Sequence, residues 1–77
     1  MKEFIEYIVK NLVDEPDSVR VEETTEENKL ILTLHVAKND VGKVIGKQGK
    51  TAKSLRHLLT AVAAIHNMSS KLQISDE

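Results

Sequence analysis

The chain has 77 residues, no Cys and a formal net charge of −1. This length fits one small domain over residues 1–77, and the absence of Cys excludes a disulfide framework and a thiolate metal site. No apolar run approaches the roughly 20 residues of a transmembrane helix, and the N-terminus does not resemble a signal peptide. We therefore expect a cytoplasmic protein that makes no contact with a membrane.

The net charge conceals an asymmetry between the two halves of the chain. Residues 1–37 carry four basic and nine acidic side chains, for a net charge of −5. Residues 38–77 carry seven basic and three acidic side chains, for a net charge of +4, and no acid occurs between Val41 and Ser75. Such a local basic field attracts a phosphate backbone even on a nearly neutral protein. The alternative is that these lysines only solvate one face of a helix.

The first half of the chain predicts a helix followed by a β-hairpin. Apolar residues recur at helical spacing over residues 2–13, and the Pro-containing segment 14–17 ends that helix. Residues 19–22 and 30–36 alternate apolar with polar side chains, as half-buried strands do. The short polar segment 24–28 between them predicts a hairpin loop and antiparallel pairing.

The second half predicts a short helix, a long helix and a last strand. The short helix spans about residues 40–45, with Asn39 or Asp40 as its N-cap. The long helix spans about residues 50–66, and residues 71–75 form the strand. The predicted apolar face of the long helix consists of Ala52, Leu55, Leu58, Leu59, Val62 and Ala63.

These elements together predict an α+β fold, with a three-stranded sheet packed on three helices. One feature exceeds what that fold needs: the run Ala61-Val62-Ala63-Ala64-Ile65 leaves few polar positions on the last two turns of the long helix. This surplus is either ordinary core or part of a dimer contact.

The stretch 41–51 joins the two helices of the second half and contains all three glycines of the chain. Gly46 and Gly49 enclose Lys47 and Gln48, which predicts a tight exposed turn because glycine tolerates backbone angles that other residues resist. The turn leads directly into the long helix. Unpaired N–H groups and the positive dipole end at a helix start favour an anion such as phosphate.

The sequence Val44-Ile45-Gly46-Lys47-Gln48-Gly49, followed by a helix, resembles the core motif of the KH domain, an RNA-binding module. In KH domains this GxxG loop clamps the backbone of about four nucleotides. The predicted order α-β-β-α-(GxxG)-α-β is similar to the type II KH arrangement, in which a helix and a strand precede the core. Over essentially its whole length, the chain looks most like the small bacterial single-KH proteins of the KhpA type.

The resemblance implies that RNA lies in a groove between the GxxG turn with its flanking helices and the exposed edge of the sheet. It also implies that main-chain groups near the second predicted strand discriminate bases, with weak sequence preference. Val44 either adds to an apolar floor of this groove or points wholly into the core. The implied RNA-binding residues are Lys43, Val44, Ile45, Gly46, Lys47, Gln48, Gly49, Lys50, Lys53 and Arg56.

Patterns for other chemistry are weak. The tripeptide 49–51 matches the end of a P-loop, but that motif needs glycine at position 44, which is Val44. His35, His57 and His66 are spread over a strand and a helix, and the last two are nine residues apart, on opposite sides of a helix. No Ser–His–acid arrangement or carboxylate pair suits catalysis. We therefore expect no enzyme activity, no cofactor and no metal site.

The expected function is that of an RNA chaperone or post-transcriptional regulator. The resemblance implies that the ligand is single-stranded RNA (small RNA, mRNA or rRNA). It also implies that the chain forms a homodimer or pairs with a second KH protein of the KhpB type. Proteins of this type are further linked to cell-shape and cell-wall regulation. The alternative, suggested by the apolar end of the long helix, is a protein–protein assembly module on a KH scaffold with little RNA affinity. Phe4 and Tyr7 are the only aromatic residues, which argues against base recognition by ring stacking.

Overall fold

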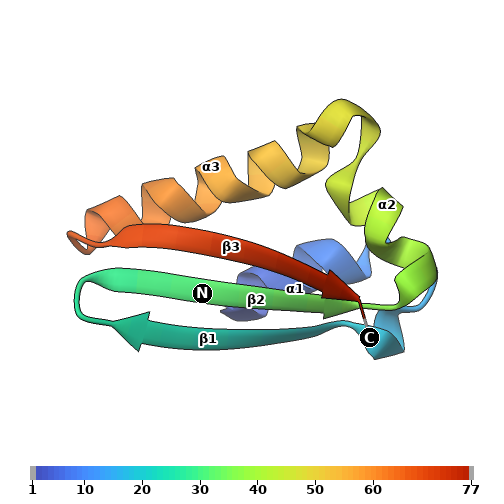
Figure 1. Cartoon of the computed structure of the whole chain (residues 1–77), viewed down its shortest axis with the longest axis horizontal. Coiled ribbons are helices and arrows are strands. Elements are labelled where there is room, and N and C mark those ends of the chain that lie inside the picture. The colour runs from blue at the N-terminus through green and yellow to red at the C-terminus, as the bar shows by residue number, and fades with distance from the viewer. Residues whose placement is uncertain (1, 77) are drawn as a thin grey trace.

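The computed structural model describes residues 2–76, in which helices cover one face of a three-stranded sheet (Figure 1). The elements in chain order are α1 (Lys2–Lys10), β1 (Arg20–Glu26), β2 (Lys29–Val36), α2 (Val41–Ile45), α3 (Lys50–Ile65) and β3 (Ser69–Asp76), with short 3-10 turns at Pro16–Ser18, Lys38–Asp40 and Lys47–Gly49. This order confirms the predicted α+β fold.

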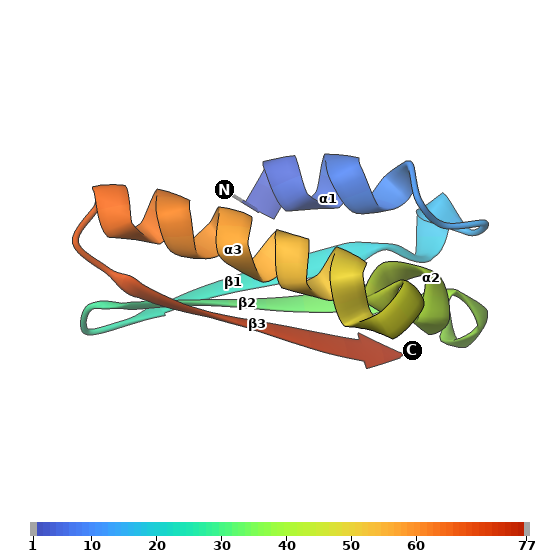
Figure 2. The ribbon, with the colours of Figure 1, turned by 90° about the horizontal axis from the view of Figure 1, so that it is seen from above.

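The sheet has the order β1-β2-β3, so that the second strand is central. β1 and β2 are antiparallel, whereas β2 and β3 are parallel, and Leu32 of β2 lies opposite Glu23 and Leu72. Two parallel strands need a crossover connection, which α2 and α3 provide. Both long helices lie on the same side of the sheet (Figure 2). β1 and β3 are therefore the two edges of the sheet.

The predicted hairpin is present, but its loop is shorter than expected. Thr24, Thr25 and Glu26 continue β1, and they pair with Ile31, Leu30 and Lys29. The β-branched threonines suit an extended strand. Glu27 adopts a φ of 51°, which lets the chain reverse within two residues. The prediction of a loop over residues 24–28 was therefore wrong by three residues.

The first helix ends at Lys10 rather than at residue 13. The side chain of Asn11 explains this, because its Nδ2 donates a hydrogen bond of 2.8 Å to the carbonyl oxygen of Tyr7. The N–H of Asn11 bonds to Ile8 instead, and Leu12 bonds to Val9, so the chain tightens out of the α-helix. At the other end of the molecule β3 is longer than the predicted strand, since parallel pairing recruits Ser69 and Ser70.

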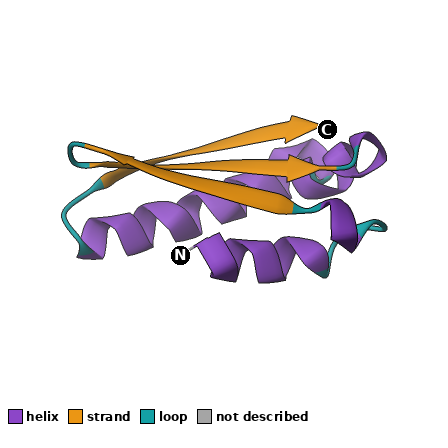
Figure 3. Ribbon diagram, turned by 90° about the horizontal axis from the view of Figure 1, so that it is seen from below, coloured by secondary structure: helices purple, strands orange, loops and turns teal. Residues whose placement is uncertain are grey.

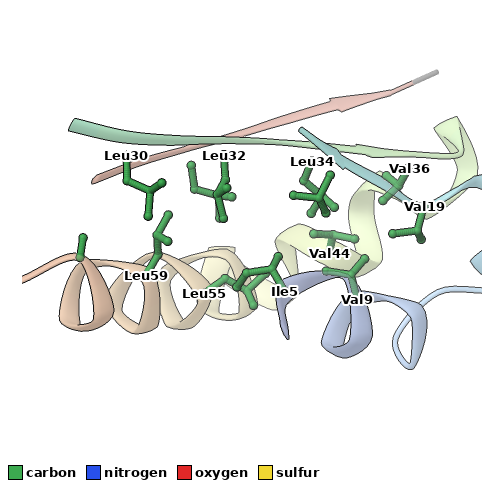
Figure 4. Close-up of a cluster of buried hydrophobic side chains, with 13 residues drawn as sticks. Ile5, Val9, Val19, Leu30, Leu32, Leu34, Val36, Val44, Leu55 and Leu59 are labelled. Atoms are coloured by element: carbon green, nitrogen blue, oxygen red, sulfur yellow. The ribbon is translucent and has the colours of Figure 1, made fainter. Parts of the chain in front are cut away.

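The core lies between the sheet and the three helices (Figure 4). Alternate residues of the central strand point into it, as the period of two predicts, and the facing helices contribute Ile5, Val9, Val44, Leu55 and Leu59. Each fully buried aliphatic side chain contributes about 1.5–3 kcal/mol. Leu58, predicted on the apolar face of the long helix, is 36% exposed and lies outside this core. None of the helices described is long and apolar enough to cross a membrane.

Asp40 is the one polar residue that is fully buried among residues 2–76. Asp40 is the N-cap residue of α2, as one of the two predicted alternatives has it, but its side chain makes no capping hydrogen bond to that helix. The Asp40 carboxylate instead accepts the backbone N–H groups of Asp14, at 3.1 Å, and Glu15, at 3.0 Å. These bonds satisfy the buried carboxylate and attach the loop after α1 to the start of α2.

Candidate nucleic-acid interface

The GxxG turn connects the C-terminus of α2 to the first turn of α3 (Figure 1). Three of its four residues have positive φ: 78° at Gly46, 56° at Gln48 and 74° at Gly49. The Gly46 N–H bonds to Gly42 at 2.9 Å and closes α2, and the Gly49 N–H bonds to Gly46 at 3.1 Å within the turn. The tight turn predicted from the glycine spacing is therefore present.

The two motif glycines are required for different reasons. A Cβ atom on Gly46 would lie 2.7 Å from the Cβ of Thr51 and 2.9 Å from its backbone nitrogen, so space as well as φ demands glycine there. A Cβ atom on Gly49 would meet no atom within 4 Å, so only the backbone conformation favours glycine. The missing side chain of Gly46 thus lets α2 and the start of α3 approach each other closely.

The start of α3 is open to an anion. Its N-cap is Gly49, and no side chain caps the helix or places an acid in its first turn. Lys47 and Gln48 on the turn and Lys50 at the helix start are all exposed. Helix N–H groups, the helix dipole and lysine charges at one place suit a phosphate group.

The apolar pair before the turn divides between the core and the surface. Val44 is fully buried, so its side chain lies in the core below the turn, which is one of the two positions that the sequence left open. Ile45 is 39% exposed and is therefore accessible beside Gly46. The buried valine anchors α2, and the exposed isoleucine gives the turn an apolar flank.

Lys43 does not stand free beside the turn. Its ammonium group is hydrogen-bonded to the carboxylate of Asp14, in the loop held by Asp40. This hydrogen bond raises the pKa of Lys43 above its ordinary value of 10.5. Among the predicted basic residues, Lys43 is thus already occupied by an acid of the same chain.

A groove runs between α3 and the edge strand β3. A hollow of about 320 Å³ in it is lined by Arg56, Leu59, Thr60, Ser70, Lys71 and Leu72. The Oγ atoms of Thr60 and Ser70 are 3.2 Å apart and join the two walls. Arg56 is the one predicted site residue that lines this hollow, while Lys50 and Lys53 lie exposed on the earlier turns of α3.

The second strand cannot form the open edge of this groove. β2 is central and pairs with a neighbour on each side, so its main-chain groups are engaged in two ladders. The open edge beside α3 belongs to β3, which pairs only with β2 in the part of the chain described. Sequence reasoning also missed Lys71 as a groove residue. The alternation around the buried Leu72 indicates an outward side chain, but not which strand lies next to α3.

The charge asymmetry of the sequence becomes a difference between the two sheet edges. β1 carries Glu22, Glu23 and Glu26 against one Arg20, whereas β3 carries one Lys71 and one Asp76 and lies next to the basic helix α3. A phosphate backbone is therefore attracted to the α3–β3 side of the molecule. No group of three or more His, Asp or Glu residues within residues 2–76 is placed to hold a metal ion.

Large apolar side chains of the helices α1 and α3 are exposed. Ile65 is 76% exposed, Leu58 36% and Phe4 47%. The apolar end of the long helix was expected to be either ordinary core or part of a dimer contact. The exposure of Ile65 excludes the first alternative for this residue. Leu58 and Ile65 are seven residues apart and therefore lie on the same side of α3, where exposed apolar surface favours contact with another protein.

The fold and the GxxG turn together define a KH domain. The sequence model of the family described as "KhpA/KhpB, KH domain" matches residues 2–74. Proteins named RNA-binding protein KhpA are 51% identical in Chlamydia trachomatis, over 100% of this chain and 99% of the relative, and 49% identical in Clostridium acetobutylicum, over 96% and 99%. The relative in Borreliella burgdorferi is 46% identical over 96% of this chain and 90% of its own length. This chain belongs to the KhpA/KhpB KH-domain family, which confirms the resemblance.

Proposed function

We propose that this chain binds single-stranded RNA in the groove between the GxxG turn, α3 and the edge of β3. The observation that carries the proposal is the turn itself, which presents Lys47 and Gln48 to solvent at an uncapped helix start. The name RNA-binding protein, carried by the relatives in Chlamydia and Clostridium, supports it. The KH motif implies that the loop holds about four nucleotides.

The proposed contacts divide by chemistry. Main-chain groups of Gly46 and Gly49 approach the phosphates, because neither residue has a side chain in the way. Lys47, Lys50 and Lys53 add positive charge along the same path. These contacts hold the RNA backbone and carry no sequence information.

Contacts to the bases come from the other parts of the groove. Ile45 offers an exposed apolar surface, and Arg56 with Lys71 supplies donors across the hollow between α3 and β3. The open main-chain edge of β3 can hydrogen-bond to base edges. Val44 supports the turn from below, and Lys43 contributes less charge because Asp14 shares it.

Such a protein performs no chemistry of its own and needs no cofactor or metal. We place it in the cytoplasm, where it acts on small RNA, mRNA or rRNA as a chaperone or post-transcriptional regulator. It works as a homodimer or with a second KH protein of the KhpB type. The exposed Leu58 and Ile65 on α3 support such pairing, and two linked grooves raise the effective concentration for the second contact.

The test compares RNA binding by the wild type and by a Lys47→Asp, Gln48→Asp double variant. A matched control, Lys38→Asp with Asn39→Asp, makes the same change of charge at two exposed residues at the opposite end of α2. Binding of a fluorescent single-stranded RNA pool is measured over a salt series, and circular dichroism verifies folding. We expect the turn variant to fold and lose binding, and the control to retain most of it.

Equal binding by the turn variant and the wild type would place RNA elsewhere on the surface. If the wild type bound no RNA at low salt, the second candidate function, a protein-assembly module, would be favoured. The exposure of Leu58 and Ile65 on α3 is the observation behind that candidate. Sedimentation of an Ile65→Asp variant then decides whether this helix holds copies of the chain together.

A further inference from the structure

The face of the sheet opposite the helices is uncovered in the part of the chain described, as Figure 3 shows. It is also hollowed. A depression of about 500 Å³ crosses all three strands and is lined by Thr24, Glu26, Lys29, Ile31, Thr33, Lys71 and Gln73. Apart from the half-buried Ile31, every one of these side chains can donate or accept a hydrogen bond or carries a charge. The depression therefore suits a polar ligand.

This depression and the groove between α3 and β3 share one lining residue. Lys71 lines both the hollow beside Arg56 and the depression on the open face. The two sites thus meet at one residue of an edge strand, with no further strand or helix to separate them in the described chain. A strand of nucleic acid that leaves the groove beside Lys71 reaches the open face directly.

The basic residues of the depression are available to a phosphate. Neither Lys29 nor Lys71 forms an ion pair within residues 2–76, in contrast to Lys43. Two residues beyond Lys71 along β3, the Gln73 side-chain oxygen accepts the hydroxyl proton of Thr33, 3.1 Å away. That bond leaves the Gln73 amide N–H groups to donate to a ligand, and both lysines lie within the same hollow.

The far side of the depression repels phosphate. Glu26 of β1 is the cross-strand partner of Lys29, and Glu22 lies further along the same strand opposite Thr33. Positive charge on β3 and β2 therefore gives way to negative charge on β1. A phosphate backbone is attracted as far as the central strand and stopped at the next one.

We propose that RNA longer than the GxxG groove passes over the β3 edge at Lys71 and lies in the depression on the open face, held by Lys29 and Gln73. This rests on the proposed function, because the groove must hold the first nucleotides. Without aromatic rings the contacts are to phosphate and sugar, so the added segment binds without base preference. The depression makes affinity depend on RNA length.

The test measures affinity for an RNA of about four nucleotides and one of about ten nucleotides by fluorescence anisotropy. The variants are Lys29→Gln and a matched control, Lys38→Gln, which removes an exposed lysine without an ion-pair partner among residues 2–76 from the turn before α2. We expect Lys29→Gln to weaken the longer RNA by about threefold to fivefold, the weight of an exposed ion pair, and to leave the short RNA unchanged. The salt slope for the longer RNA falls by about 0.7, as for one lost phosphate contact.

A second variant works in the opposite direction. Glu26→Gln removes the repulsion at the far side of the depression, so it should tighten the longer RNA and not the short one. Equal affinity of the wild type for both lengths would overturn the proposal while leaving the GxxG groove in place. The same effect from Lys38→Gln would also overturn it, since the loss would then reflect net charge alone. No binding of either length by the wild type would refute the proposed function itself.

Discussion

The two ends of α2 are held in opposite ways. At its start, the fully buried carboxylate of Asp40 accepts two backbone N–H groups from a loop 25 and 26 residues earlier in the sequence. At its end, Gly46 and Gly49 form an exposed turn that no side chain caps. A five-residue helix has little stability of its own, so its position must come from tertiary contacts. The comparison teaches that a buried side chain fixes the start of this helix, whereas a main-chain hydrogen bond closes its end and the turn that follows stays exposed.

The largest effect is expected from Asp40→Ala, which removes the fixed end. Two partly buried N–H groups, of Asp14 and Glu15, lose their acceptor, and we expect about 2–4 kcal/mol less free energy of unfolding. Urea denaturation measures this. Asp40→Asn retains one acceptor oxygen and should lose about half as much. A loss below about 0.5 kcal/mol for Asp40→Ala would show that this carboxylate does not anchor α2.

Gly46→Ala tests the open end. The added Cβ meets Thr51 and the residue must keep a φ of 78°, so we expect about 2 kcal/mol of destabilisation and a loss of RNA binding. Gly42→Ala is the matched control on the same helix, where a Cβ meets no atom within 4 Å. That control should be neutral or stabilising by up to about 1 kcal/mol. If both substitutions behaved alike, the close approach at Gly46 would not govern the turn.

Gly49→Ala should have a smaller effect than Gly46→Ala. Its Cβ would enter open space, so the cost is only that of a φ of 74°, about 1 kcal/mol. Gly49→Asn, which tolerates this conformation better, should recover part of the stability. Thermal unfolding of the two variants measures the difference. A larger loss of stability in Gly49→Ala than in Gly46→Ala would contradict this prediction, because only the Cβ atom at Gly46 meets neighbouring atoms.

The smallest effect is expected from the ion pair between Lys43 of α2 and Asp14 of the loop after α1. Asp14 raises the pKa of Lys43 in the folded state above 10.5, so the pair stabilises the fold below that pH and the stabilisation is lost as the pH rises through the folded-state pKa. Both side chains are exposed, and the change is therefore slight. In an Asp14→Asn variant, unfolding curves recorded from pH 7 to pH 11 should lose this contribution. Unchanged pH dependence would show that the pair does not persist in solution.

The same variant bears on the candidate interface. Releasing Lys43 from Asp14 leaves an unpaired ammonium group on α2. In Asp14→Asn, Lys43 can then contribute its full charge to RNA binding. The affinity of this variant for RNA should therefore equal or exceed that of the wild type. Because the local motif puts Lys43 beside the glycine turn, the sequence predicted it as an RNA-binding residue together with Lys47. The partner that distinguishes these two lysines lies 29 residues away in the chain.

The sequence by itself determined the elements, their order and the GxxG turn. Hydrophobic periodicity and glycine spacing act within a few residues, so the central strand, α3 and the turn at Gly46 and Gly49 could be predicted. Element ends were less certain, since single side chains decide them, as Asn11 does for α1. The family resemblance came from the same local signal.

Only the tertiary structure decided which residues meet. The parallel return of the chain puts β3, not the second strand, at the edge beside α3, and so brings Lys71 to the groove. Packing turns Val44 into the core, and it buries the carboxylate of the N-cap residue Asp40, which accepts N–H groups of a distant loop instead of those of α2. These outcomes depend on contacts between segments far apart in the chain, where local propensity carries no information about distance. The glycine turn could therefore be predicted from the sequence, whereas the buried Asp40 carboxylate that anchors the start of α2 could not.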